Sequence, residues 1–480
     1  MDQGASLKFM GEEAPNQGAQ KHGAPTAFED VGMFDPVIQD FNEVLDRTPN
    51  YADAYVGRAC AYGRLGEYTL AIRDFDHAIR LRPKDYDSYF LRGCAFGRLK
   101  KFERAVEDLN VAITLKPGYA DAYVIRAHAF GEMGLYERAL QDYEAALALN
   151  PDDPDVYYNR ALAYGELKLF ERAIDDYDEA IRLNPDDADI YHNRGWAYGK
   201  LERYERAIED YDRAIKINPF DAEIFYGRGL AHDRSSRYER AIEDYNQAIK
   251  LNPEFSNAYW GRGLASARLG LYQQAIDDYD AALKLAPTNA GIYYNRGRAY
   301  RQLQQYDNAI KDYDEAIRLD PEDADAYCGR GLTCDKMGEH EKAIADYNKA
   351  ISINPRDAVF YYNRGVVYRE LERYNRAIDD FNMAIRLDPS DPDMYHNRGW
   401  VFSKTGQYDK AINDYNEVLR LNPDDADVYY MRGLALAEQG KLEQCLEDLE
   451  NALDLFILQG RETASQQAMD KLKEIRPRVQ

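Results

Sequence analysis

Proline recurs at a constant interval through most of this chain. From Pro49 to Pro423 a proline stands at every 34th residue, and no insertion or deletion breaks the register. A fixed period of this length indicates a repeat architecture, and 34 residues is the length of one helix-turn-helix unit. The chain is therefore expected to stack helical hairpins side by side. The recurring residues are Pro49, Pro83, Pro117, Pro151, Pro185, Pro219, Pro253, Pro287, Pro321, Pro355, Pro389 and Pro423.

Residues 188–221, ADIYHNRGWAYGKLERYERAIEDYDRAIKINPFD, illustrate the local pattern. Apolar residues at helical spacing predict a first helix over about 189–201 and a second over about 205–217, called helix A and helix B. Pro219 cannot continue helix B, and Asp221 is a good N-cap for the next helix A. Each repeat therefore carries its own start and stop signals.

Large and small residues alternate along these two helices in a recognisable order. Within 188–221 the order large, small, large, small, large, small, proline is carried by Tyr191, Gly195, Tyr198, Ala207, Tyr211, Ala214 and Pro219. This order resembles the tetratricopeptide repeat, in eleven units from Ala52 to Asp425 and a looser twelfth over 426–459. The resemblance implies an all-α fold, a right-handed α-solenoid superhelix of tandem 34-residue helix-turn-helix repeats.

The two ends of the chain depart from the repeat. Residues 1–27 have the composition of a disordered segment, and 28–51 read as a degenerate first half-repeat before the solenoid of about 12 repeats over 52–459. Residues 460–480 are expected to form a capping helix and tail that cover the last repeat. The apolar stripe of that helix is Ala464, Ala468, Leu472 and Ile475.

An arginine and an aspartate recur with the same period. With Ala52 as position 1, the arginine is at position 7 of helix A and the aspartate at position 23 of helix B, from Arg58 with Asp74 to Arg432 with Asp448. Both fall on packing faces, where an unpaired charge is costly. We therefore predict a structural Arg–Asp ladder, in preference to arginines that bind an acidic ligand.

The opposite face of helix A carries aromatic residues at positions 5 and 9. The resemblance implies that this face lines a concave groove, where aromatic side chains are favoured anchors for a peptide. A half-buried lining between neighbouring helices is the other interpretation, and both stay open. The residues are Phe90, Tyr158, His192, Tyr226, Trp260, Tyr294, Tyr362, His396 and Tyr430 at position 5, with Trp196 and Trp400 at position 9.

Basic residues at positions 9, 12 and 13 form a strip beside these rings. Opposite them, aspartates recur at position 2, so the two rows together would orient an extended peptide. A solvated charged face is the alternative. The basic residues are Arg234, Arg268, Arg298, Arg301, Lys336, Arg369 and Lys404.

The composition limits which partners this protein is expected to bind and where in the cell it is expected to lie. A net charge of -24 and a pI near 4.8 argue against nucleic acid and anionic membranes, and no apolar run is long enough for membrane insertion. The five cysteines form no CxxC pair, which fits a reducing, cytoplasmic location. The seven histidines lie in different repeats, so we expect no metal site, no cofactor and no catalytic residues.

These observations predict a non-enzymatic scaffold or adaptor that binds a peptide or partner protein in its groove. Two alternatives remain, an RNA-binding helical-repeat protein and an assembly factor or regulator of a multiprotein complex. No Lys or Arg occupies position 2, 5 or 6, which by comparison with the family argues against heat-shock chaperone C-terminal tails as ligands. The partner and the oligomeric state are left open.

Overall fold

A computed structural model describes residues 31–478, and the segment 1–27 predicted to be disordered lies outside this range. Over the described residues the chain forms 26 α-helices and one short 3-10 helix, with no strand. The predicted all-α repeat fold is confirmed. None of the helices in this range combines the length and apolar character needed to cross a membrane.

Twelve helical hairpins follow a first helix, α1 (Val31–Arg47). The helices A are α2 (Ala52–Arg64), α4 (Tyr86–Arg98), α6 (Ala120–Glu132), α8 (Pro154–Glu166), α10 (Ala188–Lys200), α12 (Ala222–Arg234), α14 (Ser256–Arg268), α16 (Ala290–Gln302), α18 (Ala324–Lys336), α20 (Ala358–Glu370), α22 (Pro392–Lys404) and α24 (Ala426–Glu438). The helices B are α3 (Tyr68–Leu81), α5 (Phe102–Leu115), α7 (Tyr136–Leu149), α9 (Phe170–Leu183), α11 (Tyr204–Ile217), α13 (Tyr238–Leu251), α15 (Tyr272–Leu285), α17 (Tyr306–Leu319), α19 (His340–Ile353), α21 (Tyr374–Leu387), α23 (Tyr408–Leu421) and α25 (Leu442–Leu458).

Helix boundaries follow the predicted start and stop signals closely. Helix α10 begins one residue before the predicted start, and α11 ends at Ile217 as expected. The carboxylate of Asp221 accepts a hydrogen bond of 2.8 Å from the backbone N–H of Glu223, which caps α12 as predicted.

Within each hairpin, helix A packs against helix B through small residues and one large ring. Tyr279 of α15 is buried, and Gly263 of α14 lies against it so closely that an added Cβ would stand 2.6 Å from the ring. Glycine is required there because a methyl group at that distance would overlap the ring. The same contact recurs between Gly229 and Tyr245.

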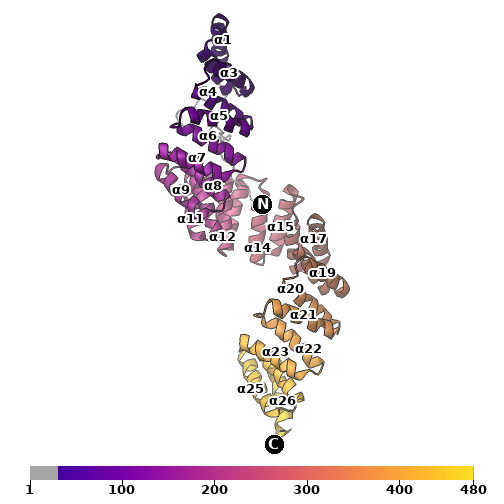
Figure 1. Ribbon diagram of the computed structural model, residues 1–480. Coiled ribbons are helices and arrows are strands. Elements are labelled where there is room, and N and C mark those ends of the chain that lie inside the picture. The colour runs from indigo at the N-terminus through magenta and orange to yellow at the C-terminus, as the bar shows by residue number, and fades with distance from the viewer. Residues whose placement is uncertain (1–30, 479–480) are drawn as a thin grey trace. The chain divides into compact units, whose positions relative to one another are not determined.

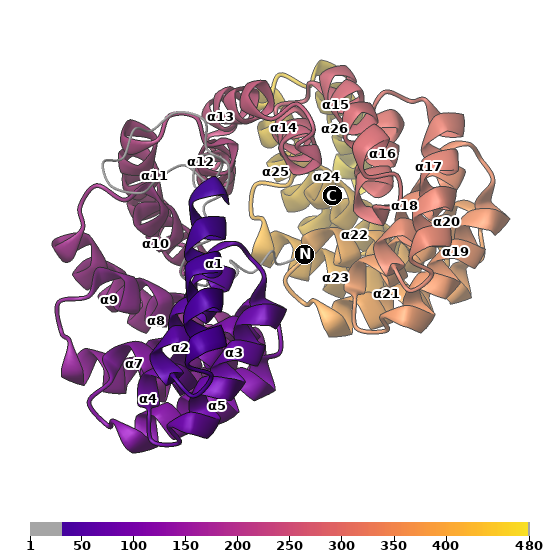
Figure 2. The ribbon, with the colours of Figure 1, turned by 90° about the horizontal axis from the view of Figure 1, so that it is seen from above.

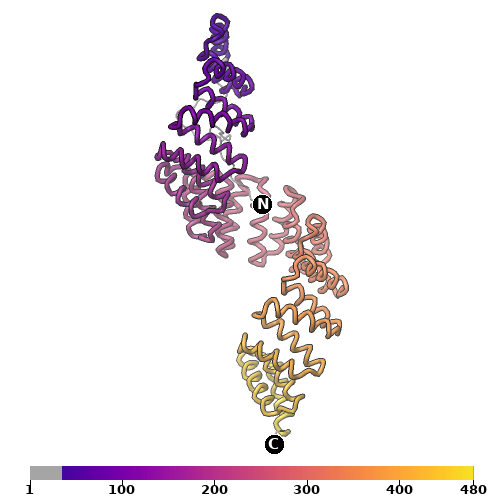
Figure 3. Tube along the Cα trace, in the orientation of Figure 1, coloured from indigo at the N-terminus to yellow at the C-terminus, as the bar shows by residue number. Residues whose placement is uncertain are grey.

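The hairpins group into two compact units, with the boundary between Pro253 and Glu254. The N-terminal unit holds α1–α13 and the C-terminal unit α14–α26, each a row of consecutive hairpins (Figures 1 and 3). In each unit, helices A of neighbouring repeats touch one another. The stack therefore curves with helices A inside, as Figure 2 shows for α8, α10 and α12 relative to α9, α11 and α13, and for α16 and α18 relative to α17 and α19.

The last helix, α26 (Glu462–Ile475), packs on α25 in place of a further repeat. Ala468, Leu472 and Ile475 are buried, and Leu472 and Ile475 share a cluster with Cys445 and Leu449 of α25. Helix α26 thus covers an apolar face of α25 that would otherwise be open to water, and its role as the terminal cap stays a prediction.

Candidate functional site

The predicted Arg–Asp ladder is confirmed in all twelve repeats. In one representative pair, Nε of Arg194 donates to Oδ2 of Asp210 at 2.8 Å and Nη2 donates to Oδ1 at 2.6 Å. The side chains are 18% and 7% exposed, so the pair is largely withdrawn from water.

The third guanidinium nitrogen reaches the preceding repeat. Nη1 of Arg194 donates to Asp178 of α9 at 2.5 Å, and an Asp or Asn accepts the equivalent bond in ten of the repeats. In Arg160 the hydrogen bond to Asp176 raises the pKa of the guanidinium, which keeps the charge in place. The ladder neutralises its own charges and joins adjacent repeats, so it offers no binding site for an acidic ligand.

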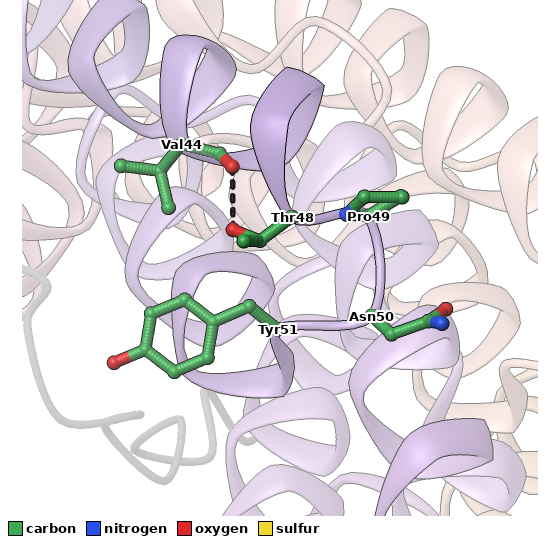
Figure 4. Close-up of a pocket in the computed structure, with 5 residues that line it drawn as sticks. All are labelled: Val44, Thr48, Pro49, Asn50 and Tyr51. Carbon is green, nitrogen blue, oxygen red and sulfur yellow. Dashed lines mark hydrogen bonds between the residues drawn. The ribbon is translucent and has the colours of Figure 1, made fainter.

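Two hollows in the N-terminal unit lie away from the predicted site residues. One lies where α1 turns into α2, beside Val44, Thr48 and Tyr51, and the Thr48 hydroxyl donates to the Val44 carbonyl at 2.7 Å (Figure 4). The other contains Arg92 of the ladder with Asp76 and Asp108. Arg92 in the second hollow is bonded to both Asp76 and Asp108 and so belongs to the ladder.

The aromatic residues at position 5 are half-buried on the inner side of each unit. Several of these rings pack on the position-24 ring of the same repeat, for example Tyr158 on Tyr177 with centroids 6.0 Å apart. The rings thus form a half-buried lining between helices, and binding of a peptide by their accessible parts stays a prediction. His192 meets Tyr211 edge to face, and three further pairs are tilted, namely Tyr226 with Tyr245, Tyr294 with Tyr313, and Tyr362 with Phe381. Phe90 instead packs on Tyr119 of the loop before the next repeat, and Tyr430 on Phe456 of α25.

The tryptophans of the predicted groove differ from one another in exposure. Trp196 is 37% exposed and meets Phe170 edge to face at 5.6 Å, and Trp400 meets Tyr374 in the same way at 6.4 Å. Trp260 is half-buried, and its indole N–H has no hydrogen-bond partner within residues 31–478. The N–H group itself is buried, so this donor lacks a hydrogen bond and is not exposed to solvent.

The basic residues of the inner strip remain largely unneutralised. Over the described residues, six of the seven have no carboxylate oxygen within 4.0 Å, namely Arg234, Arg268, Arg298, Arg301, Lys336 and Lys404. Arg369 makes only a long contact of 3.8 Å to Glu370, and it bonds to Asn397. By contrast, outer cations such as Arg318 are paired with a glutamate on their own helix.

The strip and the rings meet at Trp400. The guanidinium carbon of Arg369 lies 5.5 Å from the centre of its ring, and the ammonium of Lys404 lies 5.2 Å from it. Arg298 stands over Tyr294 in the same way at 5.7 Å. The side chain of Arg369 is 26% exposed, so part of its guanidinium remains open to solvent.

The position-6 asparagines are already engaged within the protein. The amide of Asn193 donates to the Asp189 carbonyl at 2.8 Å and to the Tyr158 hydroxyl at 3.1 Å. Asn397 makes the equivalent bonds to Asp393 and Tyr362. These amides hold neighbouring helices A together, and both of their N–H groups are used in doing so.

Sequence reasoning missed one cluster, in the C-terminal unit. Asp335, His340 and Glu370 each bring one ligand atom to within 4.8 Å of the others, although the histidines had been expected to lie without such neighbours. The available signal was His340 itself, at a position where nearly every other repeat has Tyr or Phe.

Family models of the tetratricopeptide repeat match most of the chain. Models described as "Tetratricopeptide repeat" match 56–120, 229–290, 154–187, 188–221, 324–357, 358–391, 278–311, 381–413 and 426–456, and one described as "TPR repeat" matches 127–168, 297–338 and 401–440. The chain belongs to the tetratricopeptide repeat family, whose repeats serve as protein-interaction scaffolds.

Three solved structures that match this chain share little sequence with it. Cut9 in the APC/C hetero-tetramer Cut9–Hcn1 is 16% identical, with 84% of this chain and 93% of that chain covered and a TM-score of 0.44. Yeast Tom70 is 19% identical, with 91% and 97% covered and a TM-score of 0.41. YrrB, described as a TPR protein with an unusual peptide-binding site, is 25% identical, with 38% and 95% covered and a TM-score of 0.34. No curated protein matches the chain.

Proposed function

We propose that this protein is a non-enzymatic scaffold that binds an extended, carboxylate-bearing segment of a partner protein along the inner faces of its helices A. One observation carries the proposal. Six basic side chains of this face have no carboxylate within 4.0 Å over the described residues, in a chain whose net charge is -24. Acidic side chains are abundant in this protein, yet none of them pairs with these six cations within 4.0 Å over the described residues. A carboxylate of another molecule can therefore bind them.

Both units combine cations with aromatic rings on their helices A. The C-terminal unit supplies most of the cations, next to Trp260, Tyr294, Tyr362 and Trp400, and this mixture favours alternating acidic and apolar side chains. The N-terminal unit also carries cations beside its rings. Position 13 holds Arg64, Arg98, Lys200 and Arg234, and the ammonium of Lys200 lies 5.0 Å from the centre of the Trp196 ring. Each unit is proposed to use its own inner face.

Affinity capture from the native host tests this assignment. A double variant, Trp260→Ala with Arg301→Glu, removes one ring and reverses one charge on the inner face. Leu285→Ala with Arg318→Glu is the matched control, because it makes the same changes to exposed side chains of α15 and α17. We expect the inner-face variant to lose partners that the control retains, with the loss growing at higher salt. Equal capture by both variants would place the binding surface elsewhere.

RNA binding is the alternative with the clearest discriminating measurement. The helical repeat is compatible with it, but the net charge is repulsive toward phosphate, so we expect no retention on heparin at physiological salt. Retention that the Arg301→Glu change abolishes would favour RNA. A role as assembly factor or regulator of a multiprotein complex would follow from the identity of the captured partners.

A further inference from the structure

A histidine and two carboxylates converge between two consecutive repeats of the C-terminal unit. Asp335 lies near the end of α18, His340 is the first residue of α19, and Glu370 is the last residue of α20. Nδ1 of His340 is 3.0 Å from Oδ1 of Asp335, and a Glu370 oxygen completes a trio of ligand atoms within 4.8 Å of one another. Three different helices therefore deliver one ligand atom each.

This trio is not part of the repeating pattern. Position 17, where His340 stands, holds Tyr or Phe in ten of the other eleven repeats and Leu442 in the last. In two of those repeats the ring meets a tryptophan of the next helix A, Phe170 with Trp196 and Tyr374 with Trp400. His340 faces α20 in the same way, and Glu370 is the side chain that it meets.

We propose that Asp335, His340 and Glu370 bind a divalent transition-metal ion of the zinc type. One imidazole nitrogen and two carboxylate oxygens form a ligand set that zinc accepts, with bonds of about 2.0–2.2 Å. Tetrahedral bonds of that length separate neighbouring ligand atoms by about 3.3 Å, so the 3.0 Å between His340 and Asp335 needs to open only slightly. Imidazole favours zinc over magnesium or calcium, which prefer oxygen ligands.

The site is open to ions from solvent. The side chains of Asp335 and His340 are 12% and 28% exposed, and that of Glu370 is 41% exposed. The nearest competing cation is Arg369, whose contact with Glu370 is 3.8 Å long, and Lys342 is bound to Glu339 instead. Three protein ligands leave a fourth coordination position for water.

Metal binding would join α18, α19 and α20 and stabilise the junction of these two repeats. Calorimetric titration of the full chain with zinc chloride, after removal of metals with a chelator, tests the site. We expect one saturable site and a rise in melting temperature, and we expect cobalt to give the visible absorption of tetrahedral coordination. Magnesium chloride is expected to give no binding at the same concentration.

Two variants locate the site, and a third is the control. His340→Phe introduces the residue that other repeats carry there, as Phe102 and Phe170 do, and Glu370→Gln alters an exposed side chain, so both are expected to fold. Each should weaken zinc binding at least about tenfold, whereas His77→Gln, in α3 of the N-terminal unit, should leave it unchanged. Equal affinity in the wild type and both variants, or no saturable binding by the wild type, would overturn the proposal.

Discussion

Arginine at position 7 can occupy a packing face because its guanidinium finds acceptors, on all three nitrogens in ten of the twelve repeats. Two donate to an aspartate of the same repeat and the third donates to the repeat before it, as in Arg194. Its guanidinium also lies 5.6 Å from the centre of the Tyr191 ring. The charge is thus tolerated only while its partners are present, so removing either partner leaves an uncompensated charge away from water.

Removing one member of an Arg–Asp pair of the ladder should therefore destabilise the N-terminal unit. We expect Arg194→Leu and Asp210→Ala each to lower the free energy of unfolding by about 3 kcal/mol. This value is the lower end of the range found when one member of a buried pair is removed. Urea unfolding, with hydrogen exchange in α10 and α11 as a local readout, measures the change. Arg206→Leu is the control, because its pair with Glu209 is exposed, with side chains 69% and 66% accessible, and pairs of that kind contribute little.

His128 makes the stability of the N-terminal unit depend on pH. It is 1% exposed, beside the ring of Tyr143, and burial lowers its pKa to about 4. The unfolded chain takes up the proton near pH 6.5, before the folded chain does, so stability is complete above that pH and falls between about 6.5 and 4.

The expected size of this effect is roughly 3 kcal/mol across that window. Unfolding curves recorded at several pH values for the wild type and His128→Leu would show it as a difference in slope. The leucine variant should be less sensitive to acid. Parallel curves for the two proteins would rule out His128 as the source.

At the scale of helices, each hairpin depends on its neighbours for cover. Helices A bury one face against helix B and use the other to line the inner side of the unit, which no single hairpin can complete. The last hairpin has no following repeat, and α26 supplies the missing face. A terminal helix with a polar outer side is the usual solution in stacked repeats.

Loss of packing in α26 should therefore unfold the end of the C-terminal unit. Ile475 is fully buried, and we expect Ile475→Ala to cost about 2 to 4 kcal/mol through lost burial and a cavity. Met469→Ala, on the exposed side of the same helix, is expected to change little. Differential scanning calorimetry compares them, and similar melting temperatures for the two variants would contradict a capping role.

At the scale of the whole molecule, the chain divides into two compact units. The 34-residue interval between prolines is the same on both sides of the boundary at Pro253. The spacing of the repeats therefore does not predict where the chain divides. The C-terminal unit has its own buried clusters, centred for example on Tyr279, Tyr347 and Tyr415.

A chain of residues 254–480 is expected to fold by itself. Stacked repeats draw their stability from their own packing and from nearest neighbours, and this unit contains six complete hairpins and the capping helix. Circular dichroism should show a helical protein with a cooperative thermal transition. A chain that is largely unfolded or aggregated would show that the unit requires the N-terminal repeats.

Sequence alone determined the features that lie within one repeat. Residues close together in the sequence determine the helix boundaries, the cap at Asp221 and the pairing of Arg194 with Asp210. Because the period is constant, the same local structure recurs along the chain. The capping helix was also predictable, since the apolar stripe with Leu472 and Ile475 needs a surface to cover.

Tertiary structure decided what depends on contacts between repeats. The third bond of Arg194, the half-burial of rings such as Tyr158 and the lack of any described carboxylate beside Lys336 all follow from how one hairpin is placed on the next. The meeting of His340 with Glu370 has the same origin, because a period describes every repeat alike and says nothing of which side chains of two different repeats touch.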